Sequence, residues 1–177
     1  MSDAPFRRNF DAAQDPRTAA NALMLQPGVH VVSSGAAILG TTTNDSAAVG
    51  YVGEYVESIV SSSASVTSGT AANVTSISLT RGDWDVAGNV SFTIVGNVTQ
   101  TVASVSTTSA TVVASPNPGR ASPAYASAAA PIINSPDVNV APRRVSLGSS
   151  GSAFLVALAT FTTSGTVKGA IWARRVR

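Results

Sequence analysis

The stretch RGDWDVAGNVSFTI, residues 81–94, alternates between apolar and polar side chains. The even positions from 84 onward are Trp84, Val86, Gly88, Val90, Phe92 and Ile94, and the odd positions between them are Asp85, Ala87, Asn89, Ser91 and Thr93. A period of two is typical of a β-strand with one buried face and one solvated face. The pattern predicts a strand near 84–95 whose inward side chains are Trp84, Val86, Val90, Phe92 and Ile94.

Shorter segments of the same kind continue along the chain from Val29. Turns rich in Gly, Asn, Asp and Ser separate candidate strands at 29–33, 51–60, 63–67, 73–80, 98–107, 143–147, 153–162 and 166–176. Because no interior segment has a convincing helical pattern, residues 29–177 are predicted to form an all-β domain, an antiparallel β-sandwich or jelly roll. Residues 114–142 hold six of the nine prolines and are expected to form a long surface excursion with little regular structure.

Residues 1–28 differ from the rest and are predicted to form an N-terminal anchor arm. Asp15 is a candidate N-cap, Pro16 fits the first helical position, and Pro27–Gly28 ends the helical pattern. A helix of about ten residues is marginal alone, so this partly helical arm is expected to dock on a partner. Its candidate partner-binding residues are Phe6, Arg7, Arg8, Phe10, Leu23 and Leu25.

Several function classes are disfavoured by composition. The formal net charge is +2, only 11% of residues are charged, and no basic run resembles a nucleic-acid-binding stripe. The absence of cysteine excludes disulfides and thiolate chemistry, and a single histidine, His30, leaves the usual zinc ligand sets unavailable. The N-terminus lacks an apolar signal region and no apolar stretch is long enough to span a membrane, so we expect a cytoplasmic origin and no membrane insertion.

Catalysis would have to rely on carboxylates, of which Glu54, Glu57, Asp83 and Asp85 are the candidates. A glycosidase pair needs a deep cleft with aromatic walls, and the chain has two Trp and three Tyr. Asp83 is expected to be a turn residue after Gly82, and Asp85 an outward residue paired with Arg81 or with a neighbouring subunit's arginine. Asp45, Asp83 and Asp85 are too scattered for a calcium loop. We therefore expect a protein that is not an enzyme, with no cofactor and no metal.

The closing stretch GTVKGAIWARRVR, residues 165–177, is strand-like to its end. Its alternation places Ile171 and Trp172 on opposite faces of the strand, so a monomer would leave one of them exposed. Oligomerisation would cover the exposed residue. The candidate residues of a subunit interface are Trp172, Arg174 and Arg175.

Three longer stretches show a resemblance: LGTTTNDSAAVGYVGEYVES from Leu39, TAANVTSISLTRGDWDVAGNVSFT from Thr70, and AFLVALATFTTSGTVKGAIWARRVR from Ala153. Residues 39–177 resemble a small β-rich structural protein of tailed bacteriophages and proteobacterial prophages, of the short fibre or decoration type. The resemblance implies a virion protein, assembled in the bacterial cytoplasm, whose partners are further copies of itself in a homotrimer, other tail or capsid proteins, and a host-surface glycan or protein. A short trimeric tail fibre or spike is the first expectation, a capsid decoration protein the second, and a carbohydrate-active enzyme the third.

Overall fold

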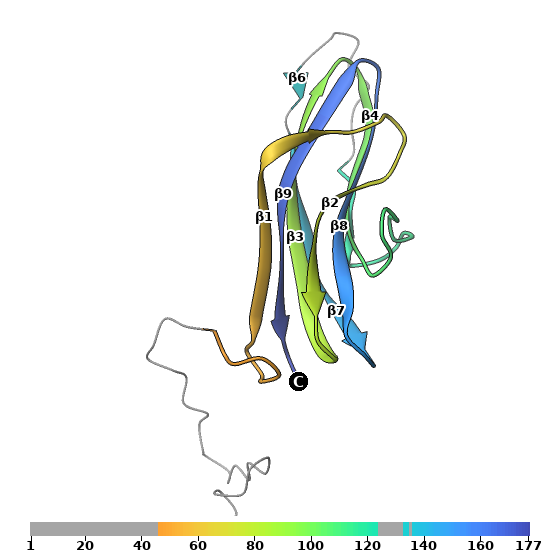
Figure 1. Ribbon diagram of the computed structural model, residues 1–177. Coiled ribbons are helices and arrows are strands. Elements are labelled where there is room, and N and C mark those ends of the chain that lie inside the picture. The colour runs from red at the N-terminus through yellow and green to blue at the C-terminus, as the bar shows by residue number, and fades with distance from the viewer. Residues whose placement is uncertain (1–45, 124–132, 135) are drawn as a thin grey trace, which may run out of the picture. The chain divides into compact units, whose positions relative to one another are not determined.

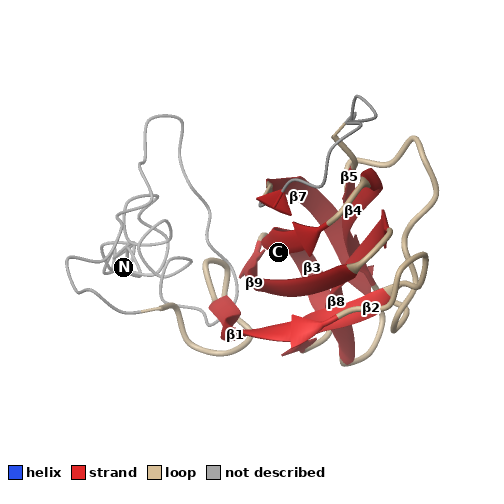
Figure 2. Cartoon of the chain, turned by 90° about the horizontal axis from the view of Figure 1, so that it is seen from above, coloured by secondary structure: helices blue, strands red, loops and turns tan. Residues whose placement is uncertain are grey.

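The computed structural model describes residues 46–123, 133–134 and 136–177, and the regular elements in these residues are β-strands (Figures 1 and 2). They are β1 (Tyr55–Ser65), β2 (Ala72–Leu79), β3 (Gly82–Val95), β4 (Val98–Ser106), β5 (Arg120–Ala121), β6 (Ile133–Asn134), β7 (Asp137–Leu147), β8 (Gly151–Phe161) and β9 (Ser164–Arg175). No helix in this part of the chain is long and apolar enough to cross a membrane. The expected strand at 29–33 and the arm at 1–28 lie outside the described residues.

The strands form two antiparallel sheets, which confirms the predicted sandwich. In sheet A the order is β1–β9–β3, with β7 and the short β6 both pairing with β3, and in sheet B the order is β2–β8–β4–β5. The first long strand thus pairs with the last, β2 with β8, β3 with β7 and β4 with β5. Strands thus pair in order from the two ends of the chain inward. This is the connectivity of a jelly roll, in which a long antiparallel ribbon is rolled into two sheets.

The core lies between the two sheets, and β3 supplies much of it. Its predicted inward residues are all buried: Trp84, Val86, Val90, Phe92 and Ile94. Sheet B contributes the opposing layer, with Leu79, Val105, Ala153 and Leu155 among its buried members. Apolar side chains at alternate positions of both sheets therefore interdigitate, as in other sandwiches.

One long strand takes the place of two short predicted ones. The segments 51–60 and 63–67 were expected as separate strands, but β1 runs from Tyr55 to Ser65 with a shift of register between Val60 and Ala64. Residues 51–53 form a turn instead, closed by the hydrogen bond from the Glu54 N–H to the Tyr51 carbonyl. A bulge lets a strand bend without ending. It interrupts the alternation in the sequence, which then resembles a break between two strands.

The predicted excursion at 114–142 is wrong in its second part. Strand β7 begins at Asp137, and its Val138 and Val140 are buried in the core against β3. Pro142 does not end the strand, because Ala141 and Pro142 together stand opposite Ala87, where the β3–β7 register shifts. Since β7 is an edge strand and a bulge needs no ladder N–H at that point, proline is tolerated there.

Candidate functional site

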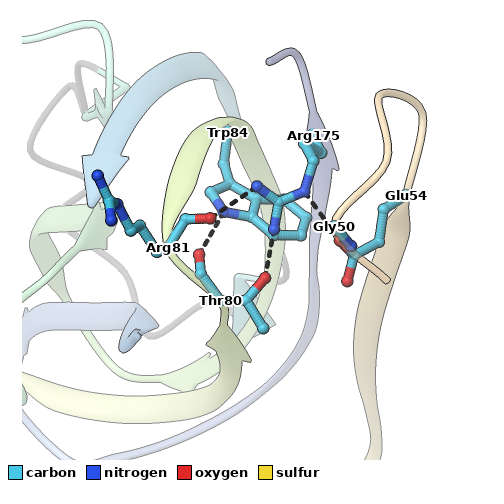
Figure 3. A network of polar contacts seen from close by, with 6 residues as sticks. All are labelled: Gly50, Glu54, Thr80, Arg81, Trp84 and Arg175. Atoms are coloured by element: carbon cyan, nitrogen blue, oxygen red, sulfur yellow. Dashed lines mark hydrogen bonds and ion pairs between the residues drawn. The ribbon is translucent and has the colours of Figure 1, made fainter. Parts of the chain in front are cut away.

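A network of buried polar groups closes one end of the sandwich (Figure 3). At its centre is Arg175, the last residue of β9, which is 4% exposed. Its Nε donates to the Glu54 carboxylate at 2.9 Å, its Nη1 to the Arg81 carbonyl at 2.7 Å, and its Nη2 to the Thr80 hydroxyl. The guanidinium carbon lies 4.3 Å from the centroid of the Trp84 ring, a cation–π arrangement.

The same network joins the start of β1, the first strand, to the end of β9, the last strand. The main chains pair next to the ion pair: the Gly53 N–H donates to the Arg175 carbonyl at 3.0 Å, and the Arg175 N–H to the Glu54 carbonyl at 2.9 Å. Gly82 makes room for it, because a Cβ there would come within 2.0 Å of the Arg175 Nη1 and its φ of +141° is one that other residues rarely adopt. The chain's entry into β1 and its exit from β9 are therefore held together.

A second ionic cluster lies beside the first and is centred on Asp83. Arg144 contacts this carboxylate with two nitrogens, its Nη2 at 2.9 Å and its Nε at 3.3 Å, and the Nε of Arg177 donates to the same Oδ2 as the Arg144 Nη2. Hydrogen bonds from Ser146, Arg144 and Arg177 hold the pKa of Asp83 far below its usual range. The Asp83 carboxylate thus binds side chains on β7 and at the C-terminus, and not the main chain of a turn as was expected.

The carboxylate of Glu54 is also committed to structure. Burial raises the pKa of Glu54, but the Gly50 N–H and the Arg175 guanidinium together outweigh it, so the pKa lies below its ordinary value. A general acid needs the opposite arrangement, a carboxyl group whose proton is retained near neutral pH. Neither Glu54 nor Asp83 has the environment of a proton donor.

The remaining candidate acids lie on the outer face of sheet A. Glu57 accepts a hydrogen bond from the Tyr55 hydroxyl at 3.0 Å, and Asp85 lines an open pocket of about 540 Å³. The first of the two pairings expected for Asp85, with the Arg81 side chain, is not among the ion pairs of the described residues, and the pairing with a neighbouring subunit's arginine stays a prediction. Within the described ranges, no group of three or more His, Asp or Glu side chains is placed to hold a metal ion. His30 and Asp45 lie outside those ranges.

The pocket gathers residues from four strands and from the segment that precedes β1. Its lining residues are Ser46, Gly53, Tyr55, Asp85, Ala87, Pro142, Trp172 and Arg174. Ala87 forms a small floor between Trp172, its neighbour on β9, and Pro142 of the β7 bulge. Arg174 stands between Tyr55 on β1 and Asp85 on β3 in the strand register. The pocket therefore combines two aromatic rings with one cation and one anion.

The predicted interface residues separate in the structure. Trp172 and Arg174 lie in the pocket on the outer face, whereas the Arg175 side chain is buried inside the subunit. The missed signal was the alternation itself: Ile171 and Ala173 are buried, so Arg175 follows them inward. A buried arginine requires a carboxylate, which Glu54 supplies. The predicted arm residues Phe6, Arg7, Arg8, Phe10, Leu23 and Leu25 lie outside the described residues.

Comparisons with known proteins give one structural similarity. No protein-family model matches the chain, and no curated protein matches it. A structure of the infectious bursal disease virus Gx strain aligns with a TM-score of 0.40 and 10% sequence identity. The alignment covers 70% of this chain and 32% of that chain, so this chain spans about a third of the other's length.

Proposed function

We propose that this protein is a non-enzymatic structural component of a bacteriophage particle, a short homotrimeric tail fibre or spike. Its N-terminal arm, residues 1–28, attaches it to the particle, and its β domain projects outward to meet the host surface. The resemblance of residues 39–177 to phage structural proteins motivates the proposal. The observation that carries it is the arrangement of the two ends of the sandwich.

The ion-pair end, which we define as residues 46–54, 80–83 and 175–177, is where the chain enters the β domain (Figure 1). The neutral end, which we define as the turns at 66–71, 96–97 and 162–163, lies at the far ends of the same strands. Its turns contain no charged residue. The chain therefore enters the β domain at the ion-pair end, and we propose that the turns of the neutral end, at the opposite ends of these strands, make the contact with the host surface.

Binding by such turns needs no reactive group. Exposed turns held by a rigid scaffold are common sites of recognition because they tolerate sequence change. Three copies of a weak contact on one trimer would multiply into useful avidity for a host glycan or protein. The commitment of Glu54 and Asp83 to ion pairs supports a role without catalysis.

Copy number and position in purified particles test this function. We expect quantitative mass spectrometry to find the protein on tails in low copy number, and a form without residues 1–28 to fold but fail to join the particle. High copy number on emptied heads would assign it to capsid decoration instead. Absence from washed particles, or release of soluble sugar from host envelopes by the purified protein, would contradict the proposal.

A further inference from the structure

The exposed apolar side chains of the described residues are concentrated at one place. Seven large apolar residues are exposed, and five of them fall between Val49 and Ile59. Val49, Tyr51, Val52 and Ile59 are each between 66% and 73% exposed, and Tyr55 is 42% exposed. We call these five residues the β1 patch. Scattered apolar residues are normal on a surface, but a cluster of this kind indicates a site of association.

A hollow adjoins the β1 patch. Ser46 and Gly53, which flank the protruding Val49, Tyr51 and Val52 in sequence, both line the pocket described above. Tyr55 belongs to the patch and to the pocket wall. One face of the molecule thus carries protruding apolar side chains and, next to them, a concave surface with Trp172 and Ala87.

The two edges of sheet A are protected very differently. The β7 edge carries Asp137, Pro142, Arg143 and Arg144 together with a bulge, and such features prevent edge-to-edge association. The β1 edge, YVESIVSSSAS, has one charged residue and no proline, and β1 pairs with β9 alone among the described strands. β1 also has a bulge, between Val60 and Ala64, but an eleven-residue edge with a single charge and no proline is expected to be covered in the assembled protein.

We infer that the β1 patch, the β1 edge and the adjoining pocket form the contact with a second copy of this chain. This deepens the proposed homo-oligomer by naming its surface. A copy of the chain brings a protruding segment to match the hollow, and a contact between two such different surfaces can close into a ring of three copies. The charge of a second copy also suits this surface. The pocket holds one carboxylate, Asp85, and one guanidinium, Arg174, so it favours neither a polyanion nor a polycation as the partner. The pocket residues Trp172, Tyr55 and Arg174 also belong to the residue types that are enriched in interface hot spots.

The oligomer mass of the full chain in solution tests this surface. We expect light scattering to give a multiple of the 17.8 kDa chain mass, and Ile59→Glu to weaken self-association by about tenfold or more, as loss of a hot spot does. Thr93→Glu is the matched control, since Thr93 is exposed on β3 of the same sheet and lies outside the patch and the pocket. Thermal melts of both variants, which should match that of the wild type when diluted to monomer, keep loss of fold separate from loss of contact.

A second measurement locates the contact directly. A photo-crosslinking residue in place of Val52 should join two copies of this chain, and the same residue in place of Thr93 should not. A monomeric full chain would overturn the inference, as would an unchanged oligomer mass in Ile59→Glu. If association appears only after residues 1–45 are removed, the surface is covered by the chain's own N-terminal part, and the inference is again wrong. None of these outcomes decides whether the protein is in the particle, which the copy-number measurement tests separately.

Discussion

The ion-pair end and the neutral end close the same sandwich by different chemistry. At the ion-pair end, the carboxylates of Glu54 and Asp83 bind the guanidinium groups of Arg175 and Arg177 and that of Arg144 on the adjacent β7. These contacts hold the entry into β1, the β2–β3 turn and the C-terminus together. At the neutral end, hydroxyl and main-chain groups perform the closure: the Ser68 hydroxyl donates to the Phe161 carbonyl at 2.7 Å and accepts from the Phe161 N–H at 2.9 Å. The Thr162 hydroxyl accepts from the Asn97 N–H at 3.0 Å.

The two ends of the sandwich are expected to differ in how many substitutions they tolerate. A buried ion pair is costly to break, because removing one partner leaves the other charge unpaired in the low-dielectric interior. Neutral hydrogen bonds at exposed turns contribute about 0.5–1.5 kcal/mol each, and water can replace them when they are lost. The ion-pair end is therefore restricted to a few residue types, whereas the neutral end is open to variation, as a contact surface requires.

The largest expected effect is at the centre of the ion-pair end. Arg175→Met should lower the free energy of unfolding by about 3–5 kcal/mol, because Glu54 stays buried without its cation. Denaturant unfolding measures the loss. Lys168→Met, on the same strand β9 but exposed and outside the pocket, is the control and should change stability by less than about 0.5 kcal/mol. Equal losses would show that the buried pair has no special role.

A core residue toward the neutral end should be comparably sensitive, because the two ends differ in polar closure and not in apolar packing. Phe92→Ala removes a ring that is 1% exposed and should cost about 3–5 kcal/mol through lost transfer energy and a residual cavity. Thr93→Ala, the next residue and outward, should cost less than about 0.5 kcal/mol. If the two variants melt together, the register of β3 is wrong near this end.

Acid should weaken the ion-pair end selectively. The folded pKa values of Asp83 and Glu54 lie below their ordinary values of 3.8 and 4.5, so both carboxylates stabilise the fold fully above those values. That stability is lost as pH falls toward the lower folded values, since the unfolded chain then binds more protons. We expect Asp83→Asn to be less stable than the wild type at neutral pH and to lose less stability on acidification.

Arg144→Met, which changes the other partner of the ion pair, should also lose less stability than the wild type on acidification. It removes a cation that lowers the pKa of Asp83. Urea unfolding at a series of pH values gives both profiles. A wild-type stability that stays constant from neutral pH to well below the ordinary carboxylate range would contradict the ion-pair account.

The smallest expected effect is at the neutral end. Ser68→Ala removes two hydrogen bonds to Phe161 at an exposed turn and should cost about 1 kcal/mol. Thr70→Ala in the same turn is the control, because the hydrogen bond from its own N–H to the Thr67 carbonyl survives the change. A loss in Ser68→Ala as large as in Arg175→Met would remove the distinction between the two ends.

Much of the fold follows from local pattern, as β3 shows. Alternation identifies its inward residues and the turns on either side, because burial of one sheet face imposes a period of two. The same pattern underestimates β7, whose Pro142 suggests a loop although Val138 and Val140 belong to the core. Proline excludes a central strand but not a bulged edge strand, and a sequence does not show which strands are edges.

The site was harder to predict because its members are distant in sequence. Arg175 and Glu54 are 121 residues apart and meet since β1 and β9 pair, a contact that no local pattern specifies. The charges of Asp83 and Arg144 likewise meet across the β3–β7 pairing. The pocket on sheet A also depends on the order of four strands, so the sequence offered Trp172 and Arg174 as interface candidates but neither the pocket that they line nor the β1 patch beside it.

In the proposed particle, the ion-pair end faces the particle and the neutral end faces outward. The most direct test of this orientation is antibody labelling of intact particles that carry a short epitope either after Gly69, in a turn where a side chain meets open space, or after Arg177, whose side chain is 71% exposed. We predict that antibodies bind the epitope after Gly69 on intact particles, and bind the epitope after Arg177 only once the protein is released. Labelling at Arg177 with a shielded Gly69 site would contradict the account.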